Sequence, residues 1–322
     1  MASSWSALGV RLYIQHVRRS KQIFGNAQNI KDSMHELYNR PQSFTPPANT
    51  GPDIIVERAD VTDWPLYRVS LRRSPGETPL KGPQKAMLYL HGGAFYREIE
   101  SAHWAFIFQA ARQTGLTVFV PIYPLVPRPS ATAQQIVPAL VDLCRHIKDD
   151  IVNITGDSAG GCLALATTQH MQDIAPSQAA KLTSVVLISP VLDITFSHPE
   201  IERLDKLDPW LGLEGLRSII PLYAGELPTS DPIVSPLFGD IERLPPVLLL
   251  SGTHDMLNAD ARRLSARFQG ENSDECVPGG IQSERFTYVE QADMIHVYPL
   301  LPHWEGRQAR DLIMEFVQSH LQ

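Results

Sequence analysis

The sequence predicts an α/β fold: an eight-stranded, mostly parallel sheet covered by helices, with a helical cap over one end. Short apolar runs bounded by turn residues alternate with amphipathic stretches through most of the 322 residues. This alternation is typical of a parallel sheet covered on both faces. Residues 1–50 and 193–240 do not follow the alternation and are long enough to form a cap, in the place where α/β folds bind ligands.

The expected elements follow in chain order. "GPDIIVERAD" and "WPLYRVSLRR" are interpreted as two antiparallel strands, and six more apolar runs stand at 86–90, 116–122, 151–155, 183–189, 246–251 and 284–290. Apolar residues at three and four spacing predict helices at 101–114, 131–148, 159–172, 257–269 and 305–321. We therefore expect N-terminal cap helices in residues 1–50 and a core over residues 51–322 with a cap insertion at about 193–240.

A glycine-rich turn joins one expected strand to the next helix. "NITGDSAGGC", residues 153–162, places Ser158 in the pattern G-x-S-x-G. A serine nucleophile at such a turn has a strained backbone, so the residues two before and two after must be small, as Gly156 and Gly160 are. For the pentapeptide alone, a turn with a capping serine is the alternative. Asp157 is interpreted as a local hydrogen-bonding or pocket residue.

The stretch "LYLHGGAFYRE", residues 88–98, leaves the third strand as a loop with very small side chains. Backbone N–H groups fixed in such a loop can stabilise the negative oxygen that develops during acyl transfer. We expect these donors to be Gly93 and Ala94, with Gly92 as a further candidate, together with Ala159 at the start of the next helix. His91 is interpreted as a residue that braces the loop, with a general base as the alternative.

A serine nucleophile requires a base and a group that orients the base. Asp255 follows the seventh strand in "PPVLLLSGTHDML", and His296 follows the eighth in "ERFTYVEQADMIHVY". The order serine, acid, histidine is the one used by α/β hydrolytic enzymes and differs from that of two protease classes. The neighbouring alternatives are Asp260, Asp293 and His254.

With these residues identified, the chain from residue 51 onward resembles the hormone-sensitive-lipase group of α/β-hydrolases. "HGGAF" resembles the H-G-G-G-[FW] motif of this group, "GDSAGG" matches its serine turn, and "YPLVP" stands where it has Y-R-L-A-P. "DPIVSPLFGDIERLPPVLLLSGTHDML" follows its acid-loop pattern, and the expected cap sequence "ADMIHVYPLLPHW" is similar to fungal acetyl esterases of steroid or polyketide metabolism. The departures are Ala94, Pro124 and Arg128.

The resemblance implies a serine carboxylesterase without a cofactor. It would hydrolyse short-chain acyl esters, such as O-acetyl groups of an apolar metabolite, through Ser158, His296 and Asp255 and an acyl-enzyme. A biosynthetic cyclase, dehydratase or condensation enzyme that uses the same site stays open, because fold does not fix function. A ligand-binding receptor of this fold is the other alternative, although such receptors lack the histidine that this chain keeps at His296.

Composition excludes other classes. The net charge of −7 and the lack of a long basic stripe argue against a nucleic-acid partner. Neither H-E-x-x-H nor a phosphate loop occurs, so no metal or nucleotide is expected. The cysteines, Cys144, Cys162 and Cys276, are interpreted as free thiols in a reducing compartment. With no signal peptide and no run of eighteen apolar residues, we expect a cytoplasmic protein with a small-molecule ester as partner; a homodimer is left open.

Residues 5–24 carry Trp5, Leu8, Leu12 and Tyr13 at helical spacing. An apolar stripe on a helix has to be buried against something. We expect a cap helix over the active site, with a core helix and an interfacial membrane helix as alternatives.

Overall fold

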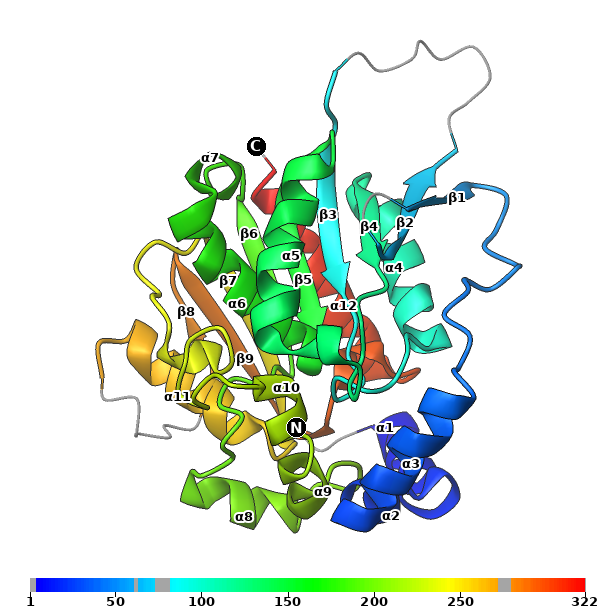
Figure 1. Cartoon of the computed structure of the whole chain (residues 1–322), viewed down its shortest axis with the longest axis vertical. Coiled ribbons are helices and arrows are strands. Elements are labelled where there is room, and N and C mark those ends of the chain that lie inside the picture. The colour runs from blue at the N-terminus through cyan, green and yellow to red at the C-terminus, as the bar shows by residue number, and fades with distance from the viewer. Residues whose placement is uncertain (1–3, 61–62, 73–81, 272–278, 322) are drawn as a thin grey trace.

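The computed structural model describes residues 4–60, 63–72, 82–271 and 279–321, and these form a nine-stranded sheet (Figure 1). All eight expected strands are present, and β8, a two-residue strand, was not expected. The strand order is β1-β2-β4-β3-β5-β6-β7-β9-β8. The strands are β1 Ile54–Asp60, β2 Pro65–Leu71, β3 Lys85–Leu90, β4 Thr117–Pro121, β5 Asp150–Asp157, β6 Ser184–Ile188, β7 Val247–His254, β8 Ile281–Gln282 and β9 Phe286–Ile295.

The six strands from β4 to β9 in the sheet order run parallel, and β1, β2 and β8 are antiparallel to their neighbours. Because successive side chains of a strand point to opposite faces, β3 contributes to two separate cores. Leu88 and Leu90 belong to one core, and Met87 and Tyr89 belong to the other. Because these six strands are parallel, their carboxyl ends lie at one edge of the sheet, and the sheet itself lies between the two apolar cores.

Five long helices cover the two faces. Residues of α5 Ala133–His146, α6 Ala159–Ile174 and α11 Asn258–Phe268 are buried in the first core. Residues of α4 Ser101–Thr114 and α12 Trp304–Ser319 are buried in the second. The ends of all five lie within two residues of the expected ends, because each helix has one apolar stripe facing the sheet. The short helix α7 Pro176–Ala179 follows α6.

Six further helices gather at the end of the molecule to which the parallel strands point (Figure 1). We call them the cap helices: α1 Trp5–Tyr13, α2 Ser20–Phe24, α3 Ala27–Asn39, α8 Pro199–Asp205, α9 Leu213–Arg217 and α10 Ile220–Ala224. The N-terminal cap helices (α1 to α3) and those of the later insertion (α8 to α10) touch backbone to backbone, since a Cβ on Gly215 of α9 would lie 2.0 Å from the carbonyl oxygen of Phe24 of α2. Phe24, Ile30 and Met34 are buried in the first core.

One expected part of the cap lies elsewhere. Residues 292–304 form the end of β9, the 3₁₀ turn Tyr298–Leu300 and the start of α12, so this stretch belongs to the core. Cys144 and Cys162 are buried free thiols, whereas Cys276 lies outside the described residues. In the part of the chain that the structure describes, no helix combines the length and hydrophobicity needed to cross a membrane.

Candidate active site

Ser158 occupies the sharp turn between β5 and α6. Its backbone has φ 53° and ψ −119°, a conformation that non-glycine residues rarely adopt. Its N–H donates to the Ile188 carbonyl at 2.9 Å, which ties the turn to β6. A Cβ on Gly156 would lie 2.2 Å from the Gly160 carbonyl oxygen, and one on Gly160 would lie 2.0 Å from the Leu90 carbonyl oxygen. The small residues of the motif therefore allow the strand, the turn and the helix to pack this closely.

The structure brings the three predicted residues together at the carboxyl ends of β5, β7 and β9. His296 Nε2 lies 2.9 Å from Ser158 Oγ, and His296 Nδ1 lies 3.0 Å from Asp255 Oδ2. The second carboxylate oxygen of Asp255 accepts the Leu257 N–H at 3.0 Å. All three side chains are buried. This is the geometry in which an imidazole can take a proton from a serine while a carboxylate orients the ring.

The electrostatics of the site favour a basic imidazole. Burial lowers the pKa of His296, but the charge and hydrogen bond of Asp255 and the charges of Asp208 and Asp157 outweigh it, so the pKa lies above its ordinary value. A higher pKa makes the ring a stronger proton acceptor. The edge of Trp210, from the cap insertion, meets the His296 ring with centroids 5.9 Å apart.

The alternatives weighed from the sequence lie away from Ser158. Asp260 pairs with Arg263 at 2.8 Å, and burial raises the pKa of Asp260 to about 7. Asp293 is 3.9 Å from His254, whose Nδ1 accepts the Arg11 guanidinium at 3.0 Å. None of these groups reaches the serine hydroxyl in the described structure, whereas His296 does.

The loop after β3 lies against the serine turn, since a Cβ on Gly92 would be 3.0 Å from Ser158 Cβ. The Gly92 N–H donates to Asp157 Oδ1 at 3.0 Å, so the expectation that it serves as an oxyanion donor is wrong. Within the described residues, the N–H groups of Gly93 and Ala94 have no hydrogen-bond acceptor in the protein. Ala159 begins α6, and the N–H groups of a first helical turn have no acceptor within the helix.

Asp157 and His91 hold this loop in place. Asp157 is buried and also accepts the Tyr89 hydroxyl at 2.6 Å, and its other oxygen lies 3.3 Å from His103 Nε2. His91 contacts the Gly92 carbonyl through Nδ1 at 2.7 Å and stacks on Tyr123 with centroids 4.5 Å apart. Burial and the charge of His103 lower the pKa of His91 to about 4, so the ring is neutral. These contacts are those of bracing residues.

His103 was not identified from the sequence. It is the third residue of α4, and its Nδ1 accepts the Glu100 N–H at 2.8 Å, which leaves Nε2 to donate to Asp157. Burial opposes a charge on Asp157, but the charge and hydrogen bond of His103 and the Tyr89 hydrogen bond outweigh it and lower the pKa of Asp157. Its only sequence signal is a histidine in the first turn of the helix after the "HGGAF" loop.

Asp208, also missed, links the cap insertion to the acid loop. Its carboxylate accepts the N–H groups of Trp210 at 2.7 Å, Leu211 at 2.9 Å and Met256 at 3.0 Å. Burial and the charge of Asp255 raise the pKa of Asp208 to about 6. This side chain fixes the position of Trp210 against His296.

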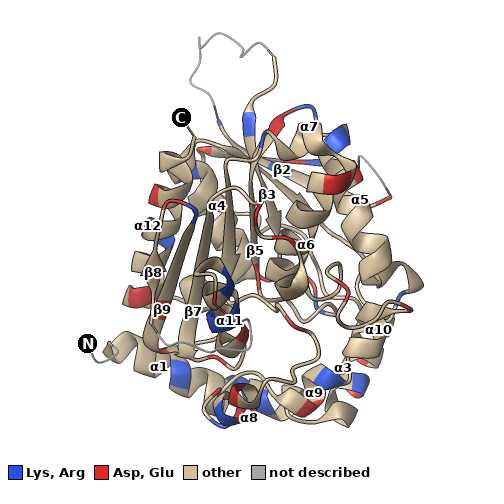
Figure 2. Ribbon diagram, turned by 90° about the vertical axis from the view of Figure 1, so that its left-hand side faces the viewer, with Lys and Arg blue, Asp and Glu red and all other residues tan. Residues whose placement is uncertain are grey.

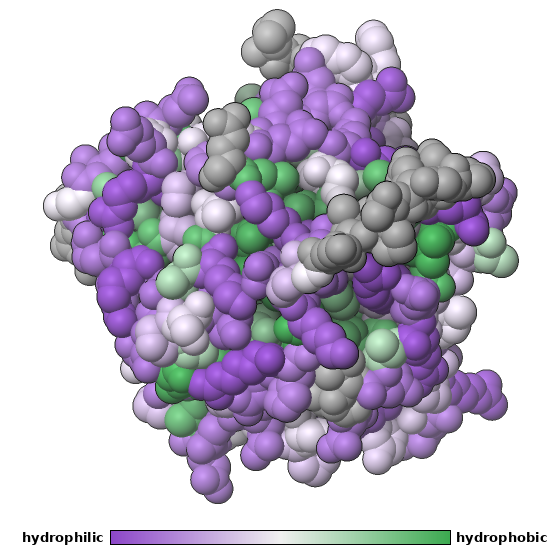
Figure 3. Space-filling model, turned by 90° about the horizontal axis from the view of Figure 1, so that it is seen from above, coloured by the Kyte–Doolittle hydropathy of each residue, from purple (hydrophilic) through white to green (hydrophobic). Residues whose placement is uncertain are grey.

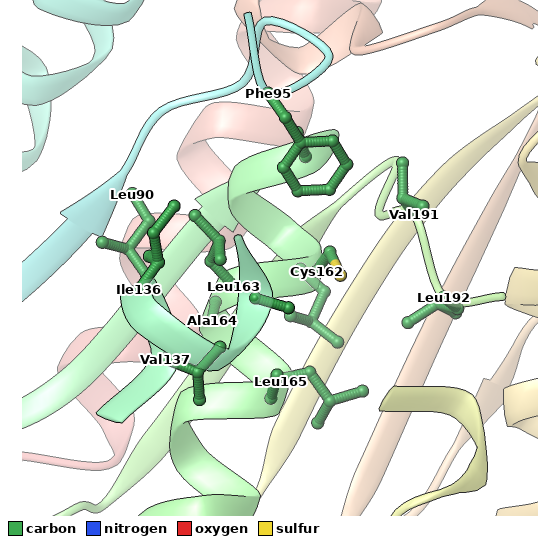
Figure 4. Packing of buried hydrophobic residues seen from close by; sticks show 14 of the residues in the cluster. Leu90, Phe95, Ile136, Val137, Cys162, Leu163, Ala164, Leu165, Val191 and Leu192 are labelled. Atoms are coloured by element: carbon green, nitrogen blue, oxygen red, sulfur yellow. The ribbon is translucent and has the colours of Figure 1, made fainter. Parts of the chain in front are cut away.

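Ser158 lines two cavities of different character. The smaller has a volume of about 20 Å³ and an apolar lining that includes Phe95, Val191 and Leu216. Figure 4 shows Phe95 and Val191, from the loops after β3 and β6, next to the start of α6. The larger has a volume of about 270 Å³, and its lining includes His296 and residues of the cap helices. No cluster of three or more metal-binding side chains occurs among the residues that the structure describes.

Comparisons with known proteins agree with the fold and with these motifs. A family model described as an alpha/beta hydrolase fold matches residues 87–298. A triacylglycerol lipase of Mycobacterium tuberculosis (strain ATCC 25618 / H37Rv) is 34% identical over 233 residues, covering 70% of this chain and 45% of the relative. An esterase of Acinetobacter venetianus is 32% identical over 197 residues, covering 58% of this chain and 62% of the relative. The chain thus spans less than two thirds of the length of either relative.

Among solved structures, an esterase from the bacterial hormone-sensitive lipase family is similar over 100% of both chains, with a TM-score of 0.72 and 26% identity. The chain belongs to the α/β-hydrolase family that the model describes. The predicted hormone-sensitive-lipase type is confirmed.

Proposed function

We propose that this protein is a serine carboxylesterase that hydrolyses short-chain acyl esters without a cofactor. The observation that carries the proposal is the hydrogen-bonded series Ser158 Oγ, His296 and Asp255, with distances of 2.9 and 3.0 Å. The names of the relatives, an esterase and a lipase, support ester hydrolysis as the reaction class.

Each residue has a separate task in the proposed mechanism. His296 takes the Ser158 proton as the oxygen attacks the ester carbonyl, and Asp255 orients the ring and stabilises its positive charge. The N–H groups of Gly93, Ala94 and Ala159 stabilise the oxyanion. The alcohol leaves with the proton from His296, and water then attacks the acyl-enzyme with the same imidazole as base.

The two cavities predict which side of Ser158 receives each part of the ester. The leaving alcohol must accept a proton from His296, so we assign it to the larger cavity, which His296 lines. The acyl group then enters the smaller cavity, where its apolar lining suits a hydrocarbon. A volume of about 10 to 15 Å³ accommodates one water-sized group. The 20 Å³ available therefore favour acetyl or propionyl over longer chains.

The test measures hydrolysis of p-nitrophenyl acetate, butyrate and octanoate by the purified full chain. We expect kcat/KM to fall as the acyl group lengthens, and Ser158→Ala to remove both turnover and fluorophosphonate labelling, with a rate loss of about 10⁴ to 10⁶. Ser251→Ala is the matched control, because Ser251 is also buried but lies within β7. Hydrolysis that survives in Ser158→Ala would exclude Ser158 as the nucleophile. Tight binding of an ester without turnover by the unmodified protein would favour a receptor.

A further inference from the structure

The outer face of α1 and of the π-helical turn Ile14–Arg18 is apolar and exposed to solvent. Its side chains, which we call the α1 face, are Trp5 (89% exposed), Leu8 (39%), Leu12 (45%), Tyr13 (54%) and Val17 (65%). The inner side of the same segment is packed: Ile14 is buried against Ile295 and Leu301. The helix is therefore held in place by one side, while the described part of the chain leaves its larger apolar side chains exposed.

This apolar exposure is concentrated in one place. Five of the 13 exposed large hydrophobic side chains among the described residues fall between residues 5 and 17. At the opposite end of the sheet, hydrophilic residues dominate the surface, and apolar ones occur in small patches between them (Figure 3). Single exposed apolar residues are common in globular proteins, but a contiguous group marks an interaction surface.

The segment that carries the α1 face has charged side chains of one sign. Residues 1–31 contain five Lys or Arg and no Asp or Glu, although the whole chain has a net charge of −7. In Figure 2, α1 carries blue and no red. Arg18 pairs with Glu100 at 3.1 Å and Lys21 pairs with Asp205 at 2.7 Å, whereas Arg19 is exposed at the end of the π-helical turn.

We propose that the α1 face docks on the surface of an anionic phospholipid bilayer. Tryptophan, tyrosine and leucine on one side of a helix, with flanking cations, are the combination by which interfacial helices bind lipid. A second copy of the chain is a poorer occupant. A two-fold contact places the same patch against itself, so the cations of both copies would meet without acidic residues from this segment to offset them.

The location of the face connects it with the candidate active site. Directly after the π-helical turn, Ser20, Ile23 and Phe24 line the larger cavity together with Ser158. A bilayer bound at the α1 face therefore lies beside the segment that borders this cavity. In this respect the inference rests on the proposed function, because the benefit would be access to esters dissolved in the lipid.

The test is flotation of the full chain with vesicles of phosphatidylcholine, alone or with added phosphatidylglycerol. The binding measurement uses the Ser158→Ala protein as the parent, so that lipid binding is measured without ester hydrolysis. We expect binding to the anionic vesicles and a loss of at least about tenfold in the triple variant Leu8→Gln, Leu12→Gln, Val17→Gln. Arg19→Asn keeps a residue that tolerates the left-handed backbone, φ 52°, and should weaken binding about fivefold.

The matched control is Leu71→Gln with Ile174→Gln, two exposed apolar residues at the other end of the sheet, and it should bind as the parent does. Thermal unfolding, and hydrolysis of a soluble acetyl ester with Ser158 restored, check that the variants are folded. A milder variant, Trp5→Phe, gives a second measurement. Brominated lipid should quench the tryptophan fluorescence of the parent protein more than that of Trp5→Phe. The proposal is overturned if the parent ignores anionic vesicles, if the triple variant binds equally well, or if this face instead forms a concentration-dependent dimer.

Discussion

Gly160 offers a sharp test of how the serine turn is built. It lies in the first turn of α6, where this helix meets the end of β3. A Cβ on Gly160 would lie 2.0 Å from the Leu90 carbonyl oxygen and 2.5 Å from that of His91. Both contacts are with backbone atoms, so no side chain can rotate away. The helix or the strand must move by about 1 Å to restore a separation of 3.0 Å.

We predict that Gly160→Ala destabilises the fold by about 1–3 kcal/mol, the usual cost of overpacking. Alanine gains about 1 kcal/mol over glycine within a helix, which offsets part of that cost. The displaced segments carry Ala159 on one side and the loop with Gly93 and Ala94 on the other. Because a misplacement of about 1 Å costs roughly 10²-fold in rate, kcat for p-nitrophenyl acetate should fall by about 10².

The neighbouring residue provides the control. A Cβ on Gly161 would lie 2.8 Å from Pro190 Cβ and 3.0 Å from Pro190 Cα, so Pro190 must move by only a few tenths of an ångström, against about 1 Å at Gly160. Gly161→Ala has the same gain in helix propensity and should lose much less activity. Urea unfolding and kcat are measured for both variants. If Gly160→Ala has the same kcat and unfolding midpoint as Gly161→Ala, the close approach of α6 to β3 does not position the oxyanion donors.

Asp255→Asn should slow acylation by roughly 10² to 10⁴ at constant fold, because the imidazole loses its orienting charge; a larger loss in Asp293→Asn would show that the acid was misassigned. In the proposed mechanism the neutral form of His296 is the base. Because its pKa is raised, kcat/KM should fall as pH drops through a midpoint above 6.5, and Asp255→Asn should move that midpoint to lower pH. Deleting residues 1–40 removes Phe24, Ile30 and Met34 from the first core. We expect a lower melting temperature and lost preference for bulky alcohols; unchanged relative rates on bulky and small acetyl esters would exclude this segment from the substrate site.

The parts of the site that the sequence predicted depend on local geometry and on topology. The serine turn is local, because Gly156 and Gly160 are needed by a strand, a turn and a helix that follow one another in the chain. Asp255 and His296 lie far apart in sequence, yet both come at the carboxyl ends of strands that are neighbours in the sheet, β7 and β9. Parallel strands bring such ends to one edge, so the positions could be inferred without coordinates.

The parts of the site that the sequence did not predict depend on the direction in which individual polar atoms point. Gly92 was expected to donate to an oxyanion, but its N–H is taken by Asp157, whose orientation is set by Tyr89 and His103 from β3 and α4. No spacing in the sequence indicates that a histidine of α4 reaches the serine turn. The carboxylate of Asp157 therefore decides which loop amides stay available.

Asp208 shows the same limit for the cap. Its donors come from residues two and three positions later and, across the cap boundary, from Met256 next to the catalytic candidate Asp255. The insertion around it has no helical or strand periodicity long enough to place it, and an aspartate in a loop is normally exposed. Here burial against Asp255 is tolerated because three N–H groups solvate the carboxylate in place of water. Because the same carboxylate accepts the Trp210 and Met256 N–H groups, it ties the position of Trp210 beside His296 to the acid loop after β7.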